Sequence, residues 1–246
     1  MKTLAHSKSR FGPPINIEEE LRTGAIAYWQ GEYYQSRADR GGVSLLDYIH
    51  ALFGLLAQKH PQTVLMIGCA GGSLATMLTR TGVAVTAVDV NPQAFLIARR
   101  YFGLPHSVEC RVADGLDYLV STRKMFDAIV LDAFHGGVLP EDLISDMFFA
   151  RARNRLRKGG ALFANIHVRN DEDHAAERAS AHMAAAFGDV RILDRPVTKQ
   201  RNAIVMAGAV RGLKKPVLVM PPAIEVGKIT RVLDAMQFRP YRRQSP

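Results

Sequence analysis

The strongest constraint on the fold is a regular alternation of short apolar segments and helix-forming segments between residues 61 and 166. The apolar segments, each expected to be a strand, are residues 63–67, 83–89, 108–113, 126–132 and 161–166. Helices are expected between them, from Ser73, from Pro92, at 116–120 and at 141–157, the last stopping at the glycines of residues 158–160. Because strands that alternate with helices form right-handed crossover units, the pattern predicts an α/β fold with a doubly wound, mostly parallel sheet.

The pattern changes after a helix expected at residues 173–187. Strands at 190–195 and 202–209 are separated by too few residues for a crossover helix. Such a short connection predicts that the parallel sheet ends in a C-terminal antiparallel hairpin. Beyond it, the sequence offers a short apolar segment at 217–220 and a helix at 223–236.

The residues before the alternating region predict a small N-terminal β-hairpin. Its strands are expected at 25–29 and 33–36, after a loose arm at 1–14. A helix follows at 44–59, with Ser44 as its cap. We therefore expect three regions: the arm and small hairpin at 1–43, a cofactor-binding α/β domain at 44–210, and a basic tail with a helix at 211–246.

Composition excludes several classes of protein. The chain has 246 residues, of which 48% are hydrophobic and 22% are charged, as in folded globular proteins. No apolar stretch approaches the about 18 residues of a membrane-spanning helix, and residues 1–14 lack the apolar segment of a secretory signal. Cys69 and Cys110 have neither zinc-site nor disulfide spacing. We expect a cytoplasmic protein with no membrane segment and no metal.

The net charge of +9 is concentrated near the C-terminus. Residues 199–246 hold ten Lys and Arg but only two acids. Such a surplus attracts anionic partners such as nucleic acids, although an ordinary solvated surface is the favoured explanation, because no aromatic-rich nucleic-acid motif accompanies the charge. An anionic partner is therefore an expectation, and a homodimer is one option for the assembly.

The loop after the first strand of the alternating region is rich in glycine. It reads Gly68-Cys69-Ala70-Gly71-Gly72 and is followed by Ser73. Glycines let a backbone approach a ligand closely, and the start of the next helix offers free N–H groups. The G-x-G-x-x-G fingerprint of dinucleotide-binding proteins is absent, because alanine and serine stand at its second and third glycine positions. Alone, the loop is equally consistent with a tight turn.

Three aspartates follow three consecutive strands. Asp89 comes 21 residues after Gly68, the spacing of a carboxylate that accepts both ribose hydroxyls of a nucleotide. Asp114 ends the third strand and Asp132 the fourth. Each could be an ordinary turn or cap residue. Because parallel strands end at one edge of a sheet, the three together indicate a ligand site there.

His135 lies three residues beyond Asp132. A histidine in this loop is a candidate general base. A loop histidine without a chemical role is an equally good interpretation.

These motifs together resemble the class I S-adenosylmethionine-dependent methyltransferases. The resemblance covers residues from about 45 to 209 and rests on runs at 64–73, 87–92, 112–119 and 126–134, which have the order and spacing of that superfamily. Within it, the chain is most similar to the spermidine-synthase-like branch. Asp114-Gly115-Leu116, Met66 and the small N-terminal hairpin carry this narrower resemblance.

The resemblance implies a Rossmann-like fold with S-adenosylmethionine as cofactor. Residues 68–72 would line its methionine part, Asp89 would hold the ribose, Asp114 the adenine amino group, and Asp132 would lie at the transfer site. The expected cofactor-binding residues are Gly68, Cys69, Ala70, Gly71, Gly72, Asp89, Val90, Asp114, Gly115 and Asp132. The expected catalytic residues are Asp132 and His135.

The chain departs from the spermidine synthases at three places. Their loop acid corresponds to Gly71, and their acid-proline pair after the fourth strand corresponds to His135-Gly136. Their Tyr-Gln or Tyr-His pair corresponds to Leu45-Leu46. All three departures remove polar groups suited to holding a diamine.

These departures favour a methyltransferase with an unidentified acceptor. Intact S-adenosylmethionine carries a carboxylate that the N–H groups of Gly71 and Gly72 could receive. The alternative is an aminopropyltransferase that uses decarboxylated S-adenosylmethionine and a polyamine. A second alternative, from a different class, is a non-catalytic nucleoside-binding or scaffold protein.

Overall fold

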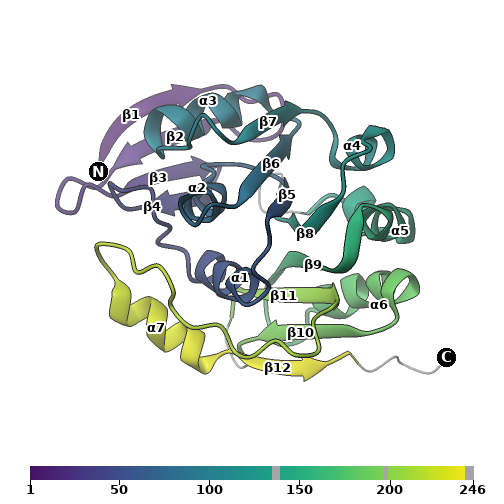
Figure 1. Ribbon diagram of the computed structural model, residues 1–246. Helices are drawn as coiled ribbons and strands as arrows, with labels where there is room; N and C mark the ends of the chain where they lie inside the picture. Colours follow the sequence, from purple (N-terminus) through teal and green to yellow (C-terminus); the bar gives the residue numbers. More distant parts are fainter. Residues whose placement is uncertain (135–138, 197–198, 242–246) are drawn as a thin grey trace.

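The computed structural model of the chain describes residues 1–134, 139–196 and 199–241 (Figure 1). Its larger sheet has eight strands in the order β12-β10-β11-β9-β8-β5-β6-β7. Their bounds are β5 (Thr63–Ile67), β6 (Ala84–Asp89), β7 (Glu109–Val112), β8 (Phe126–Leu131), β9 (Leu156–Val168), β10 (Val190–Asp194), β11 (Arg201–Gly208) and β12 (Gln237–Pro240). Strands β9, β8, β5, β6 and β7 pair in parallel, and β11 pairs antiparallel with β9 and β10. The doubly wound, mostly parallel sheet with an antiparallel hairpin is therefore confirmed.

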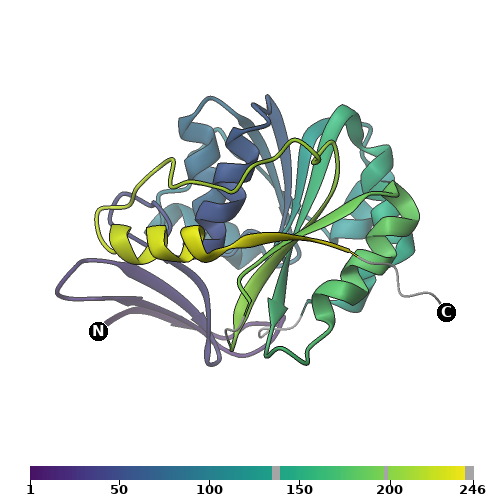
Figure 2. The same cartoon turned by 90° about the horizontal axis from the view of Figure 1, so that it is seen from below.

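Helices flank the larger sheet on both sides (Figure 2). Helices α1 (Asp47–Ala57), α2 (Ser73–Arg80), α3 (Pro92–Tyr101) and α7 (Val226–Ala235) pack in one apolar core. Helices α4 (Gly115–Ser121), α5 (Asp146–Asn154) and α6 (Ala175–Phe187) pack in the other. Alternate side chains of β5 enter opposite cores, Val64 and Met66 the first, Leu65 and Ile67 the second. This two-sided burial is why β5 is apolar from Val64 to Ile67.

The N-terminal residues form a second sheet of four antiparallel strands in sequence order. They are β1 (Lys2–Ser7), β2 (Ile15–Glu19), β3 (Ile26–Gln30) and β4 (Tyr33–Ala38). The expected hairpin is confirmed as β3 and β4. The expectation of a loose arm at 1–14 is wrong, because β1 pairs with β2 from Lys2 to Ser7. Buried Ile15 and Ile17 of this sheet pack with Ile97 and Phe102 at the end of α3, which attaches it to the domain.

Two expected helix ends differ from the structure. Helix α1 begins at Asp47, and Ser44 instead forms a β-bridge with Ala38 and accepts a hydrogen bond from the N–H of Leu46. The segment expected as one helix at 141–157 is split into the 3₁₀ turn η1 (Glu141–Ile144) and α5, which Ser145 caps. Residues 158–160 do not end a helix. They belong to β9, because the chain begins pairing with β8 as early as Leu156.

The C-terminal region is joined to the larger sheet. Strand β12, which the sequence pattern did not reveal, pairs antiparallel with β10. Helix α7 buries Ile229 and Leu233 against the core, within the expected range of 223–236. Residues 217–220 form no helix or strand.

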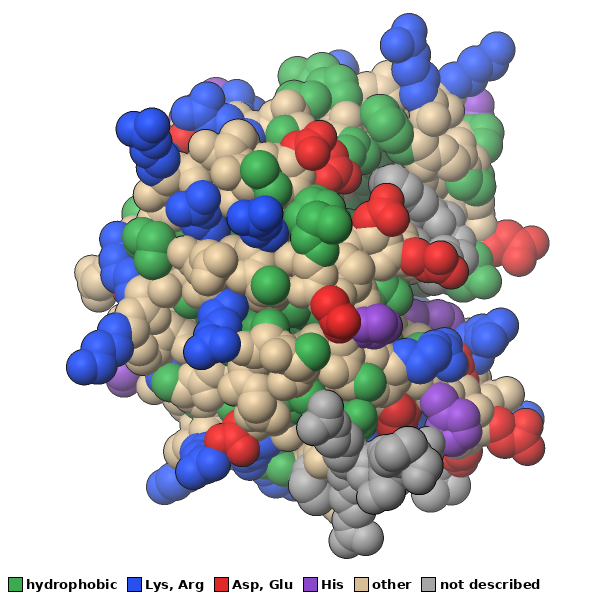
Figure 3. Space-filling model, turned by 90° about the vertical axis from the view of Figure 1, so that its right-hand side faces the viewer, with side chains coloured by type: hydrophobic (Ala, Val, Ile, Leu, Met, Phe, Trp, Pro, Cys, Tyr) green, Lys and Arg blue, Asp and Glu red, His purple; other side chains and the backbone are tan. Residues whose placement is uncertain are grey.

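Several basic side chains of this region contact acids elsewhere. Arg211 contacts Asp189, and Lys228 pairs with Glu225 at 3.0 Å. On the face drawn in Figure 3, basic side chains are scattered among acidic ones. The anionic partner and the homodimer stay predictions. Within the described ranges, no helix has both the length and the hydropathy needed to cross a membrane, and no cluster of side chains suited to a metal ion is found there.

Strands β10, β11 and β12 are linked by a buried ion-pair cluster. Asp194 is 3% exposed and accepts hydrogen bonds from Arg201 Nε at 2.8 Å and from Arg239 Nη2 at 3.2 Å. The three residues come from three neighbouring strands. The cluster therefore fixes the antiparallel end of the sheet.

Replacing Arg201 with methionine should destabilise the protein by about 3–5 kcal/mol, because the substitution leaves a buried carboxylate without its closest cation. Arg211→Met is the matched control, since the Arg211 side chain is 81% exposed and pairs with exposed Asp189. That change should cost at most about 1 kcal/mol. Urea unfolding measures both. Equal losses in the two variants would contradict the importance of the buried cluster.

Candidate active site

Two adjoining cavities lie at the carboxyl ends of the parallel strands. The first, which we call the Asp89 cavity, has a volume of about 310 Å³ and lies beside the ends of β5, β6 and β8. The second, the Tyr48 cavity, has a volume of about 280 Å³ and lies among α1, β4, β9 and β11. The residues that line both are Gln35, Cys69, Ala70, Asp132 and Phe134. A ligand in one cavity would therefore meet a ligand in the other beside Asp132.

Gly68 allows the loop after β5 to pass against the end of β8. Its φ is +95°, and a Cβ at this position would lie 2.1 Å from the carbonyl oxygen of Asp132. The Asp132 N–H donates to Ile67 O at 2.8 Å on the same side. Any side chain at position 68 would force these two loops apart.

The next two glycines do not line either cavity. The Gly71 N–H donates to Ser36 Oγ at 2.9 Å, and the Gly72 N–H donates to Cys69 O at 2.7 Å. Both N–H groups thus have partners within the protein. In this arrangement neither N–H group is free to receive a cofactor carboxylate, and the assignment of the two glycines to cofactor binding stays a prediction. Gly71 instead serves packing, because a Cβ there would lie 2.7 Å from Ser36 Cβ.

Asp89 lines the Asp89 cavity and also holds the glycine loop. Its Oδ2 accepts from the Cys69 N–H at 2.9 Å, and its Oδ1 accepts from the Asn91 N–H at 2.8 Å. Asn91, not Asp89, caps α3, through the Gln93 N–H. The cap interpretation of Asp89 is therefore excluded. Its carboxylate fixes the loops after β5 and β6 relative to each other.

Asp114 has a structural role as well as a place in the same cavity. Its Oδ1 caps α4 by accepting the N–H groups of Leu116 at 2.8 Å and Asp117 at 3.1 Å. Val90 and Gly115 also line the Asp89 cavity, as do Gly68, Cys69 and Ala70. All of the expected cofactor residues except Gly71 and Gly72 are thus brought to one cavity. Their individual roles stay predictions.

Asp132 stands where the two cavities adjoin. Its Oδ1 accepts from Asn165 Nδ2 at 2.8 Å, and its Oδ2 accepts a long hydrogen bond from the Tyr48 hydroxyl at 3.4 Å. Burial raises the pKa of Asp132 from 3.8 to about 6, although both hydrogen bonds oppose the rise. A carboxyl group with this pKa exchanges its proton readily near neutral pH.

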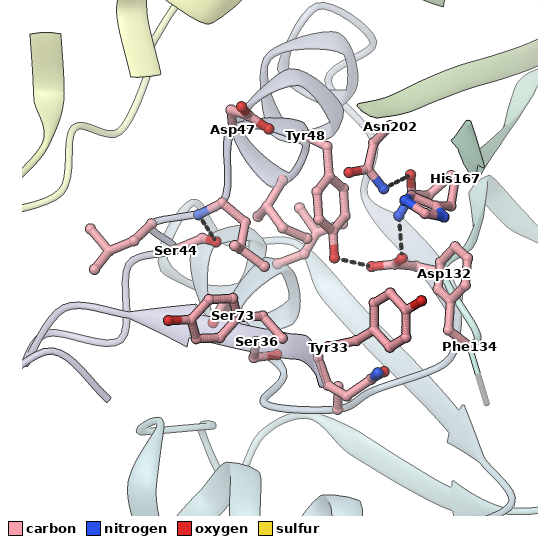
Figure 4. Close-up of a pocket in the computed structure, with 18 of the residues that line it drawn as sticks. Tyr33, Ser36, Ser44, Asp47, Tyr48, Ser73, Asp132, Phe134, His167 and Asn202 are labelled. Atoms are coloured by element: carbon pink, nitrogen blue, oxygen red, sulfur yellow. Dashed lines mark hydrogen bonds between the residues drawn. The ribbon is translucent and has the colours of Figure 1, made fainter. Parts of the chain in front are cut away.

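The sequence did not point to the side chains that surround Asp132. In Figure 4 the Tyr48 hydroxyl points at Asp132, and dashed lines lead from Asp132 towards Asn202. Asn165 is 1% exposed, and it is the one polar residue in the expected strand at 161–166. A polar residue in such an apolar run was a usable signal of a buried hydrogen-bonding role. Tyr48 and Asn202 gave no comparable signal. His135 and Gly136 lie outside the described residues.

The charged groups of the Tyr48 cavity are mostly acidic. Asp47 and Asp132 line it, and Lys228, which also lines it, pairs with Glu225 at 3.0 Å. His167 lies edge-on to Tyr33, and burial lowers its pKa, which favours the neutral ring. Among the described residues, the cavity therefore favours a cationic or hydrogen-bonding ligand over an anion.

Comparisons with known proteins agree with this architecture. The profile of the family described as methyltransferase small domain matches residues 28–198. A polyamine aminopropyltransferase of Neisseria meningitidis serogroup A is 30% identical over 214 residues, which are 84% of this chain and 80% of that protein.

Solved structures share the fold at low identity. A probable spermidine synthase from Corynebacterium glutamicum has a TM-score of 0.78 and 17% identity, with 96% of this chain and 90% of that chain covered. Human methyltransferase-like protein 13 in complex with SAH has a TM-score of 0.55 and 20% identity, with 76% of this chain and 88% of that chain covered. At these identities the two solved structures show the fold alone.

Asp89→Ala should weaken the binding of methylthioadenosine more than tenfold. This thioether nucleoside carries the adenine and ribose of S-adenosylmethionine and is used as the probe. Hydrogen bonds from ribose hydroxyls to a carboxylate each contribute roughly 1.5–3 kcal/mol, and the glycine loop also loses an anchor. Calorimetry with the wild type and the variant measures the change. Asp117→Ala is the control, because Asp117 is exposed and lines neither cavity. Equal affinity of wild type and Asp89→Ala would mean that the ribose binds elsewhere.

Proposed function

The chain belongs to the spermidine-synthase-like branch of the class I S-adenosylmethionine-dependent methyltransferase superfamily, and from this premise we propose that it transfers an aminopropyl group from decarboxylated S-adenosylmethionine to an amine. It is a transferase of the class I fold. The observation that carries the proposal is the meeting of the two cavities at Asp132.

The Asp89 cavity fits the nucleoside part of such a cofactor. Its volume of about 310 Å³ suits a small-molecule site, and four carboxylates line it, those of Asp89, Asp114, Asp132 and Asp142. Gly68 lets the loop after β5 lie close to this cavity, because a side chain at position 68 would clash with the backbone of Asp132 and Ala133. Asp89 would hold the ribose and Asp114 the adenine amino group. The sulfonium would then lie near Asp132, where the walls are shared.

The Tyr48 cavity fits an amine acceptor. It is lined by the carboxylates of Asp47 and Asp132, while its lysine is paired with Glu225. A desolvated ammonium group is costly unless a carboxylate or hydrogen-bond acceptors compensate it. Asp47 thus supplies a second acid that can hold a diamine. It compensates for the polar groups that are absent at Gly71 and Leu45-Leu46, where the chain departs from the spermidine synthases.

Group transfer from a sulfonium requires little covalent participation by the protein. The sulfonium supplies an electrophilic carbon: the C–N bond forms as the C–S bond breaks, and a neutral thioether leaves. The protein holds the two reactants in line and removes one proton from the acceptor's ammonium group, so that the neutral amine nitrogen has the electron pair with which it attacks the carbon. Asp132 in its ionised form accepts that proton, while Tyr48 and Asn165 keep its carboxylate in one orientation.

Methyl transfer from intact S-adenosylmethionine is the second candidate. It is favoured by the glycine loop, which carries no acid to bind the ammonium of an aminopropyl tail. Gly71 is also enclosed by Ser36 and Phe102, so the loop has no room for such an acid. The same amine acceptor and the same Asp132 would serve either reaction.

Turnover with paired substrates decides between the two. The protein should convert decarboxylated S-adenosylmethionine and putrescine to spermidine, identified by mass spectrometry. In Asp47→Asn, KM should rise several-fold for putrescine and much less for butylamine, because only the diamine needs the second acid. Methylated amine formed from intact S-adenosylmethionine, without spermidine, would establish the second candidate instead. No product from either cofactor would contradict the transferase proposal.

Activity should rise with pH through about 6, where Asp132 changes from its neutral to its ionised form. Asp132→Asn should remove this limb and lower kcat by roughly 10²–10⁴. Because the pKa is raised in the folded state, stability contributed by Asp132 is complete below about pH 4. That contribution is lost as the pH rises through about 6. The pH profiles of kcat/KM and of the urea midpoint test both statements.

A further inference from the structure

A chain of two carboxamides leads away from Asp132. Asn165 on β9 donates from Nδ2 to Asp132 Oδ1 at 2.8 Å, and its Oδ1 accepts from Asn202 Nδ2 on β11 at 2.9 Å. Asn202 reaches Asp132 through Asn165 and lines the same cavity. Its position is given by the antiparallel pairing of β11 with β9, in which Asn202 stands opposite His167.

An asparagine amide has a donating end and an accepting end, so its direction matters. With its oxygen occupied by Asn202, Asn165 can only present an N–H to Asp132. The reverse orientation would turn a carbonyl oxygen towards the carboxylate and favour a protonated Asp132. Asn165 is 1% exposed, so water cannot replace the hydrogen bonds that a reversed amide would lose.

We propose that Asn202 is a positioning residue of the transfer reaction: by holding the oxygen of Asn165, it keeps an N–H donor on Asp132 and so keeps that carboxylate ready to accept the proton of the acceptor. This inference rests on the proposed function and extends it to a residue that lines the Tyr48 cavity and acts on Asp132 through Asn165. Tyr48 supplies the other donor to Asp132, at 3.4 Å. At that length it is a weak substitute for Asn165.

Other ionisable groups share the two cavities with Asp132. They are Tyr28, Tyr33, Tyr34, Asp47, Tyr48, Cys69, Asp89, Asp114, Asp142, His167 and Lys228. Burial raises the pKa of Asp132, and the hydrogen bonds from Asn165 and Tyr48 lower it. A change at Asn202 should therefore reach Asp132 through Asn165.

The decisive measurement is the titration of the Asp132 carboxyl group without substrate. Carbon-13 NMR of the protein labelled at aspartate follows it, with Asp132→Asn identifying the signal. In Asn202→Ala the pKa of Asp132 should rise by about half a unit to one unit, because the donor from Asn165 is no longer fixed. In Asn202→Asp the rise should be larger, because a carboxylate can only accept and so draws the N–H of Asn165 towards itself, and because its charge also disfavours ionised Asp132; Asn202→Ala alone isolates the effect of the amide chain.

Asn154→Ala is the matched control, an identical change at an exposed amide at the end of α5. It should leave the titration unchanged. An unchanged pKa in both Asn202 variants, with folding intact by circular dichroism, would overturn the proposal even if the enzyme turns over amines. A shifted pKa in a protein that transfers no group to any amine would instead overturn the proposed function and leave the coupling of Asn202 to Asp132 standing.

In the active enzyme, the same shift should appear in the rate. The rising limb of kcat/KM against pH should move upward in Asn202→Ala by the shift that NMR reports. At high pH the rate should recover towards that of the wild type. A uniform loss of rate at every pH would indicate a merely structural role and contradict the proposal.

Discussion

The architecture of the site depends on one close approach of two backbones. The loop leaving β5 and the loop leaving β8 are in direct contact, because Gly68 has no side chain and the Asp132 N–H binds Ile67 O. This contact sets where Asp132 stands and where the two cavities adjoin. Asp89 adds a second constraint by accepting the Cys69 N–H, so the glycine loop is held from both neighbouring strands. The chemistry proposed here therefore depends on backbone geometry before it depends on any reactive group.

The polar groups around Asp132 illustrate how burial and hydrogen bonding oppose each other. Burial favours the neutral carboxyl group, whereas the donors Asn165 and Tyr48 favour the carboxylate. Burial is the larger effect, and the two donors limit the rise of the pKa to about 6. A fully apolar surrounding would hold the proton permanently, and a set of strong cationic partners would exclude it. The amides provide the intermediate condition that proton transfer needs.

The central part of the fold was accessible from the sequence because β5, β6 and β8 are short and mostly apolar and alternate with helix-forming segments. The limits of β5 agree with the expected residues 63–67. Strands β1 and β12 were missed because both lie at sheet edges, where exposed residues give no apolar run. The three aspartates were found because parallel strands bring their ends to one edge. Tyr48, Asn165 and Asn202 come from segments far apart in the chain, and only the packing of α1, β9 and β11 brings them together.

The position of β12 has a consequence for synthesis in the cell. Strand β10 pairs with β11 on one side and with β12 on the other, and β12 comes more than forty residues later in the chain than β10. On a translating ribosome, β10 and β11 emerge well before β12, so the free edge of β10 is exposed during that interval. An uncovered edge is a template for pairing with other chains. The nascent protein is therefore prone to aggregation in the interval between the emergence of β11 and that of β12, when the edge of β10 is uncovered.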